Sequence, residues 1–389
     1  MGETTIPGGT TAKLGVVEGD LRAGDHALIR ASEGSLVLVK GRAFFEGSVE
    51  VDCDFECASL ESRDGMVRVN GSLTVHEEID VEEALYTRGN VTAKKIDVGG
   101  RLSVGISLET QVADVGGSVE VQGMVRADSV DVGGSFEVLG DLNLKDLDVG
   151  GSVEVGGGEV TGKIDVGGRF AARKELKFDR IESGGTVDLR GGAGKSIEVG
   201  GRLQSRGDLH CEEIEVGGTA SVEGNLSGKE AEIGGRISVT GDLTLTGGLE
   251  VGGVAEIGGV LSGAEAEVGG RLSASKGILS GGVRIGGQVE TTQGLKAHRI
   301  EIARGARCVG VLVGGTVHIG KGAQVQDVYC SELIVEGASR LGRVYAESAD
   351  IGDICVVKEL VYTKELRVGE RVVHLSPPQK SDSLPPFPL

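Results

Sequence analysis

Acidic side chains recur in this sequence at a nearly constant spacing, and they are the first residues whose type and position could do chemistry. Each lies two positions before a pair of glycines, as in the phrase Ile-Asp-Val-Gly-Gly that begins at Ile96. The phrase returns at intervals of about 17 residues, with one shorter and one longer step. We call the set the acidic ladder: Asp97, Asp114, Asp131, Asp148, Asp165, Glu182, Glu198, Glu215, Glu232, Glu250 and Glu267. Carboxylates in a row could hold divalent cations or a basic partner, or form a solvated face that keeps the protein soluble.

Two other groups of residues have types that could support a cofactor. The phrase from Leu189 to Ser196 is similar to a phosphate-binding loop, but that pattern needs Gly where Leu189 stands and a helix after the serine. The residues that follow instead repeat the Glu-Val-Gly-Gly phrase. The six cysteines include no CxxC pair and the six histidines are scattered, so we expect no zinc site and no cofactor.

The elements that position the carboxylates follow from the apolar residues between the glycines. The repeat that starts at Gly235 contains three apolar pairs, each with one residue between its members: Ile237/Val239, Leu243/Leu245 and Leu249/Val251. This alternation is the period of a β-strand. Three short strands in each repeat leave too few residues for a crossover helix. The sequence therefore predicts an all-β fold: a single long β-helix, or solenoid, of triangular section with about 17 residues per coil and no inserted domain. Right-handed winding is favoured because left-handed hexapeptide helices keep a strict six-residue step.

The glycine corners and the outward direction of the acidic ladder follow from the same pattern. We expect the corner glycines to supply positive φ and so to bend the chain tightly. Apart from Glu182, which Ser183 follows, each ladder carboxylate lies between two inward apolar residues, so the carboxylates must point outward. Like charges about 4.8 Å apart in successive coils repel by roughly 0.9 kcal/mol per pair even in water. Relief could come from divalent cations, from a cationic partner, or from arginines just past the corner: Arg101, Arg169, Arg202, Arg236 and Arg271.

The repeat divides the chain into three segments. Residues 1–19 are rich in Thr and Gly and predict a flexible or capping segment, and residues 20–375 predict the β-helix. Residues 376–389 predict a Pro-rich tail that cannot join a sheet and is either disordered or laid over the last coil. Near the end of the β-helix, tyrosines recur after valines at nearly the period of the repeat and should stack as a short ladder: Tyr329, Tyr345 and Tyr362.

Composition and charge exclude several functions. A net charge of −19 without a basic stripe disfavours nucleic-acid binding. Polysaccharide-cleaving enzymes built on a β-helix need long loops between coils, and the short repeat leaves no room for them, so we expect no enzyme activity. No run of about 20 apolar residues predicts an integral membrane segment, and no signal peptide is expected. Sparse cysteines then favour the reducing cytoplasm.

Residues near the C-terminus carry a resemblance to a known family. Residues 314–325 read Gly-Gly-Thr-Val-His-Ile-Gly-Lys-Gly-Ala-Gln-Val, residues 333–338 Leu-Ile-Val-Glu-Gly-Ala and residues 349–354 Ala-Asp-Ile-Gly-Asp-Ile. This pattern resembles the bactofilins, which are polymer-forming cytoskeletal β-helix proteins. The resemblance implies nucleotide-independent polymerisation by end-to-end stacking and a scaffold role inside the cell. The chain departs from the usual member in its greater length and in lacking a short membrane-targeting N-terminus.

The ends of the predicted β-helix also indicate that the chain associates with other copies of itself. An open terminal coil leaves backbone N–H and C=O groups unpaired, and solenoids that stay monomeric usually carry polar caps. The sequence predicts no amphipathic helix at either end, so we expect the chain to associate with itself end to end. The expected contacts lie in the terminal coils: Leu28, Leu36, Leu38, Leu360, Tyr362, Leu366 and Val368. The alternative is a non-polymerising binding or adhesin-like rod whose acidic ladder binds cations or a basic partner.

Overall fold

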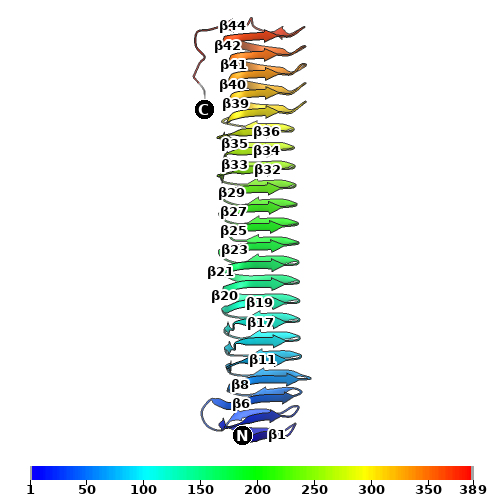
Figure 1. The fold of residues 1–389 in the computed structure, drawn as a ribbon, viewed down its shortest axis with the longest axis vertical. Coiled ribbons are helices and arrows are strands. Elements are labelled where there is room, and N and C mark those ends of the chain that lie inside the picture. The colour runs from blue at the N-terminus through cyan, green and yellow to red at the C-terminus, as the bar shows by residue number, and fades with distance from the viewer. Residues whose placement is uncertain (1, 387–389) are drawn as a thin grey trace. The chain divides into compact units, whose positions relative to one another are not determined.

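The computed structural model describes residues 2–386, and every regular element within them is a β-strand. The strands pair in parallel with strands of the coils before and after them (Figure 1). This confirms the predicted all-β solenoid and its repeat length, without an inserted domain among the described residues. The chain forms two compact units, Met1–Gly194 (unit 1) and Lys195–Leu389 (unit 2), and both are built from the same coil.

The strands of both units are short, and many coils consist of two or three of them. Those that begin in unit 1 are β1 (Glu3–Ile6), β2 (Thr11–Leu14), β3 (Val16–Val17), β4 (Asp20–Ala23), β5 (Leu28–Ala31), β6 (Leu36–Glu46), β7 (Val49–Val51), β8 (Asp54–Arg63), β9 (Met66–Val69), β10 (Leu73–Val75), β11 (Glu78–Val81), β12 (Ala84–Thr87), β13 (Val91–Thr92), β14 (Lys95–Val98), β15 (Arg101–Val104), β16 (Leu108–Glu109), β17 (Val112–Val115), β18 (Ser118–Val121), β19 (Val125–Val132), β20 (Ser135–Val149), β21 (Ser152–Val166), β22 (Arg169–Ala172), β23 (Leu176–Ser183), β24 (Thr186–Leu189) and β25 (Gly192–Val199). Those of unit 2 are β26 (Arg202–Ser205), β27 (Leu209–Val216), β28 (Thr219–Val222), β29 (Leu226–Ile233), β30 (Arg236–Val239), β31 (Leu243–Leu245), β32 (Gly248–Val251), β33 (Val254–Gly263), β34 (Glu265–Val268), β35 (Arg271–Leu279), β36 (Gly282–Ile285), β37 (Gln288–Thr291), β38 (Leu295–Ile302), β39 (Arg307–Ile319), β40 (Gln324–Val335), β41 (Arg340–Ile351), β42 (Val356–Val368), β43 (Val373–His374) and β44 (Gln379–Lys380).

One coil has three strand segments, and β15, β16 and β17 are an example. Their partners in the next coil are β18 for the first and β19 for the other two. The register joins residues one repeat apart, such as Val98 and Val115. Because the register repeats, a given position of the repeat always lies on the same face and points the same way.

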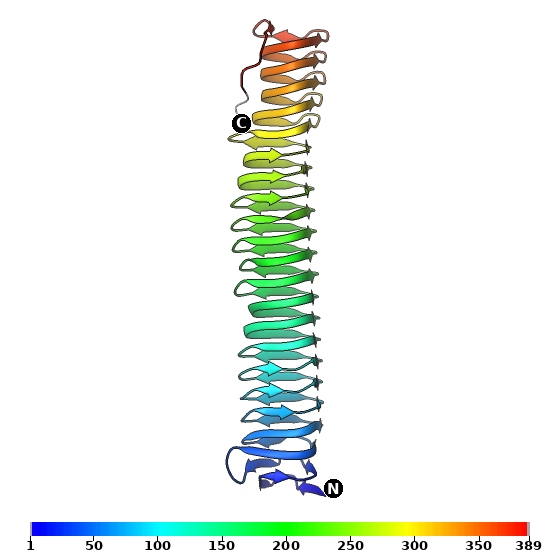
Figure 2. The ribbon, with the colours of Figure 1, turned by 60° about the vertical axis from the view of Figure 1, so that its left-hand side comes forward.

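The core of each unit is a set of apolar stacks that run from coil to coil. One stack of unit 1 takes one inward residue from each of seven coils, none of them more than 2% exposed: Ile79, Ile96, Ala113, Val130, Leu147, Ile164 and Ile181. Burying an aliphatic side chain of this size contributes about 1.5–3 kcal/mol. In Figure 2 the coils of unit 2 are likewise stacked face to face, so each coil packs on its neighbours.

The corner glycines have a different role from the one expected. The expectation of positive φ is wrong there, because positive φ occurs at other glycines such as Gly305 and Gly322 and not at Gly116 or Gly133. Successive corners instead approach so closely that a Cβ atom on Gly133 would lie 2.3 Å from the carbonyl oxygen of Gly116. The corners therefore require glycine because they have no space for a side chain.

Both ends of the solenoid extend beyond the predicted boundaries. β1, β2 and β3 pair with β4, β5 and β6, so the first coil begins at Glu3 instead of residue 20. The expectation that the C-terminal tail cannot join a sheet is wrong, since β44 pairs with β42. Pro377 and Pro378 come just before Gln379, but Gln379 and Lys380 keep their own backbone N–H groups. Residues 387–389 of the predicted tail lie outside the described residues.

Candidate functional site

The acidic ladder of unit 1 lies in one row on the outer surface. Asp97 is in register with Asp114, and each later member is in register with the next as far as Glu182. Ile96 and Val98, on either side of Asp97 in the sequence, are 0% exposed. The carboxylates between such buried neighbours point away from the core. Asp80 extends the row by one coil toward the N-terminus.

The acidic ladder of unit 2 has the same arrangement and ends at a basic residue. The members from Glu215 to Glu267 are in register from coil to coil. The next two positions are Arg284 and Glu301. Arg284 interrupts the acidic row, with guanidinium nitrogens 3.5 Å from a Glu267 carboxylate oxygen and 3.0 Å from one of Glu301. Its hydrogen bond to Glu301 lowers the pKa of that carboxyl.

The arginines just past the corners form no ion pair with the acidic ladder among the described residues. Nε of Arg101 donates to Oγ of Ser118 over 3.1 Å. Arg169 lies 3.4 Å from Asp188, which is outside the ladder. Within residues 2–386, Arg236 and Arg271 have no ion pair. The pairing suggested by the sequence is absent because an arginine that follows the two glycines emerges on the next face of the coil.

Lysines of the same strand neutralise the ladder locally. Nζ of Lys163 lies 2.7 Å from carboxylate oxygens of both Asp165 and Glu182. The middle of the unit 1 ladder, from Asp114 through Asp131 to Asp148, has no ion pair in the described part of the chain. Partial burial, together with the charges of the carboxylates above and below, raises the pKa of Asp131. Within the described residues, no ion pair therefore offsets the like-charge repulsion in this stretch.

The ladder does not build a closed cation site. Among the described residues, no group of three or more His, Cys, Asp or Glu side chains converges on a point where it could hold a metal ion. The geometry accounts for this, since each coil contributes one carboxylate to the row. The glycine-rich phrase that is similar to a phosphate-binding loop leads into β25, which is a strand.

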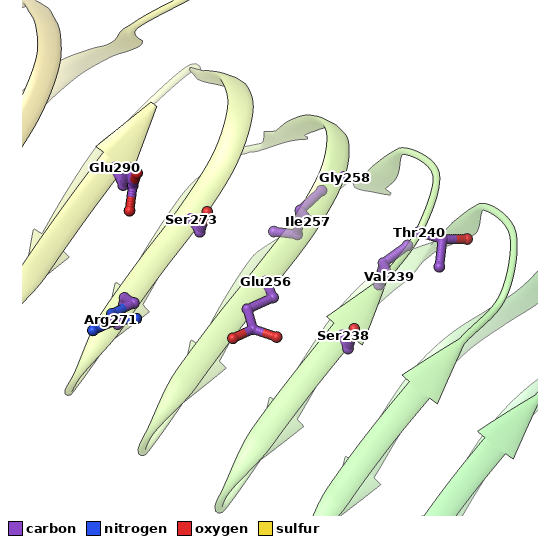
Figure 3. Close-up of a pocket in the computed structure, with 9 residues that line it drawn as sticks. All are labelled: Ser238, Val239, Thr240, Glu256, Ile257, Gly258, Arg271, Ser273 and Glu290. Atoms are coloured by element: carbon purple, nitrogen blue, oxygen red, sulfur yellow. The ribbon is translucent and has the colours of Figure 1, made fainter. Parts of the chain in front are cut away.

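A shallow groove on unit 2 is a feature that the repeat pattern does not predict. It crosses β30, β33, β35 and β37, and Figure 3 shows its polar side chains. Ser238, Glu256, Arg271, Ser273 and Glu290 lie in these strands, and Thr240 comes just after β30. Glu256 and Glu290 are the register neighbours of Ser273 on its two sides. In the described residues no hydrogen bond joins these carboxylates to the Ser238 or Ser273 hydroxyl. The sequence signal for it is the alternation of Ser and Glu at equivalent outward positions.

The three leucines expected at the N-terminal contact do not lie at the end of the solenoid. Leu28 is in register with Thr11 of the coil before it and with Glu50 of the coil after it. Leu38 is likewise in register with Val16 on one side and Glu56 on the other. Both leucines are thus one coil inside the end. Leu36, in the same strand as Leu38, is 41% exposed on the outer surface, whereas the alternate residues of this strand fill the core. The open N-terminal edge is formed by β1, β2 and β3.

The four residues expected at the C-terminal contact form the last layer of the core. They lie over buried residues of β41: Leu360 over Val344, Tyr362 over Ala346, Leu366 over Ala349 and Val368 over Ile351. Leu360 is 1% exposed and Val368 is 45% exposed. The layer is therefore covered at one side of the coil and open at the other.

The family and fold comparisons add no assignment to this geometry. No protein-family model, curated protein or solved structure matches the chain. Within residues 2–386 there is also no helix of the length and apolar character needed to span a membrane.

Proposed function

We propose that the chain is a cytoplasmic structural protein that assembles end to end into nucleotide-independent filaments and acts as a cytoskeletal scaffold. The observation that carries the proposal is the open strand edge at each end. At the N-terminal end, β1 pairs with β4 on one side and has no partner on its other side among the described residues. Unpaired edges of this kind are templates for strands of another chain.

The C-terminal end supports the proposal through both its backbone and its core. Glu365 to Val368 pair with β41, and no described strand lies beyond them. Leu366 and Val368 present apolar surface at the same place. A coil of a second copy would extend the hydrogen-bond ladder and cover these side chains, so both driving forces act together.

Two further points favour a scaffold over an enzyme or carrier. The groove holds no nucleophile paired with a base, and the described residues contain no convergent metal-ligand set. The phrases within residues 314–354 resemble the bactofilins, for which assembly of this kind is the family property. The partner of the chain is, on this proposal, another copy of itself.

A second candidate is a rod that does not polymerise and binds a basic partner along its acidic ladder. It is favoured by the stretches in which successive carboxylates have no ion pair in the described residues, Asp114 to Asp148 in unit 1 and Glu215 to Glu250 in unit 2. Such a protein would remain a single chain at all concentrations.

Negative-stain electron microscopy of the full chain, with and without millimolar Mg²⁺, separates the two candidates. We expect unbranched filaments without nucleotide, and we expect Leu366→Arg to abolish them because the charge would be buried at the joint. Met124→Arg is the matched control, since Met124 is 57% exposed on the side of a coil. Discrete particles for the unmodified chain at every concentration would refute the filament proposal.

A further inference from the structure

The segment after the last full coil turns back over the end of unit 2. Its first strand, β43, lies beside Val356 and Val357 of β42. The N–H of Val373 donates to the carbonyl of Cys355 over 2.8 Å, and the N–H of Leu375 donates to that of Val357 over 2.9 Å. These bonds occupy acceptors that a further coil would otherwise use.

The second strand of the segment covers the next part of the same coil. β44 lies beside Val361 and Tyr362, and the N–H of Ser381 donates to the Tyr362 carbonyl over 2.9 Å. Figure 1 shows the chain leaving β44 and running back along the side of the neighbouring coils. Two of the three strand segments at this end are thus covered, and the third, Glu365 to Val368, is not.

The covering segment is held less firmly than a coil. Both of its strands have two residues, whereas β42, which it covers, has 13. Val373 and Leu375 are 52% and 66% exposed, so they contribute little to the core. Pro377 and Pro378 separate the two strands and have no N–H to donate. Segments with few buried contacts and short ladders open at low free-energy cost.

We propose that residues 373–386 are a displaceable cap that limits assembly at the C-terminal end. A second copy of the chain can add a complete coil there only after the cap has released the carbonyls of Cys355, Val357 and Tyr362. The uncovered segment from Glu365 to Val368 is the place where an incoming coil first binds. This inference rests on the proposed end-to-end assembly and adds its regulation.

The test uses full-length variants that release or lock the cap. Val373→Pro/Leu375→Pro/Ser381→Pro removes the three N–H donors, and Asp382→Pro is the control because Asp382 is exposed and its N–H makes no hydrogen bond in the described chain. Val361→Cys/Gln379→Cys places a disulfide between register partners and locks the cap. Hydrogen exchange at Gln379 and Lys380 reports whether the cap is bound, and light scattering with electron microscopy reports assembly.

We expect the release variant to assemble at about ten-fold lower concentration than the unmodified chain, and Asp382→Pro to behave like the unmodified chain. The locked variant should assemble less until dithiothreitol opens the disulfide. Leu366→Arg in the release background should cancel the gain. If hydrogen exchange shows a released cap while assembly is unchanged, the cap inference is wrong. Filaments formed by the unmodified chain would still support the proposed function in that case. If Leu366→Arg has no effect on those filaments, the proposed joint is wrong instead.

Discussion

Gly252 lies directly over Gly234 in unit 2, and a Cβ atom on Gly252 would come within 2.4 Å of the Gly234 carbonyl oxygen. The same close approach joins corner glycines of unit 1, such as Gly150 over Gly133 at 2.5 Å. Real Cβ atoms do not reach such distances, so the backbone of one corner would have to move away from the next. The row of glycines is therefore a steric requirement of coil stacking.

This relationship predicts that Gly252→Ala lowers the free energy of unfolding by about 2 kcal/mol, as overpacking of a close contact does. Gly248→Ala is a matched control in the same coil, because a Cβ there meets no atom within 4 Å. It should leave stability unchanged within about 0.5 kcal/mol or raise it slightly, since alanine restricts the unfolded chain. Urea unfolding followed by circular dichroism measures both. Equal losses in the two variants would show that the corner contact is not the cause.

The buried carboxylate of Asp327 depends on Arg343. The Asp327 side chain is 7% exposed, and Nη2 of Arg343 lies 2.6 Å from its Oδ2. We expect Arg343→Leu to cost about 2 kcal/mol, because it leaves a buried charge without its partner. Asp327→Asn/Arg343→Leu should recover most of this loss. A double variant as unstable as the single one would place the effect in lost packing of the arginine.

The same pair predicts a dependence on pH. Burial alone would raise the pKa of Asp327, but hydrogen bonds from the side chain and backbone of Arg343 outweigh it and lower that pKa. A lowered folded-state pKa adds stability above the unfolded-state value, and this is lost as the pH falls through the folded-state pKa. The stability difference between the unmodified chain and Arg343→Leu should therefore shrink below about pH 4. Thermal unfolding from neutral to acidic pH checks it.

The contribution of Asp131 to stability should depend on pH in the opposite direction. Burial and the charges of Asp148 and Asp114 raise its pKa. A raised folded-state pKa adds stability below the unfolded-state value, and this is lost as the pH rises through the folded-state pKa. At neutral pH we therefore expect Asp131→Asn to melt at a higher temperature than the unmodified chain, with the advantage disappearing in acid. Asp128→Asn, on an exposed residue outside the ladder, is the control. A lower melting temperature for Asp131→Asn at neutral pH would contradict the repulsion.

The cysteines should be unreactive in the folded chain, apart from Cys53. Burial raises the pKa of the Cys57, Cys211, Cys308 and Cys330 thiols to about 12. Cys53 is half-buried and Cys355 is buried. We expect a thiol reagent at mildly alkaline pH to label Cys53 first and to reach all six cysteines only after unfolding. Rapid labelling of several cysteines without denaturant would show that the coils open locally.

The sequence alone is sufficient to predict the coil, because period-two alternation inside a fixed repeat determines which residues face the core. It is insufficient where the residues on both faces of a strand are apolar. In Leu36-Val37-Leu38-Val39 the pattern does not distinguish the two faces, and the structure buries the valines instead of the leucines. The sequence does not predict the N-terminal strands, because their inward positions include Thr4 and Ala12, which weaken the apolar signal.

Local changes in coil length account for the remaining differences. Tyr329 and Tyr345 stack with ring centroids 4.6 Å apart, as predicted. Tyr362 lies outside this stack because the next coil places Val361 over Tyr345 and brings Tyr362 into the core layer. The Asp327–Arg343 pair and the β44 contact depend on registers that spacing alone does not determine. The pairing of the cap with β42 likewise depends on how the C-terminal segment folds back, which the sequence spacing does not determine.

The repeated register also means that the solenoid changes length in whole steps. Val98 and Val115 occupy equivalent positions one coil apart, so deleting residues 99–115 would join Val98 to Gly116 just as Val115 is joined to it now. Every later side chain would keep its face, its stack and its row. The length of the solenoid could therefore change by single coils while the side chains of the remaining coils keep their places on its surface.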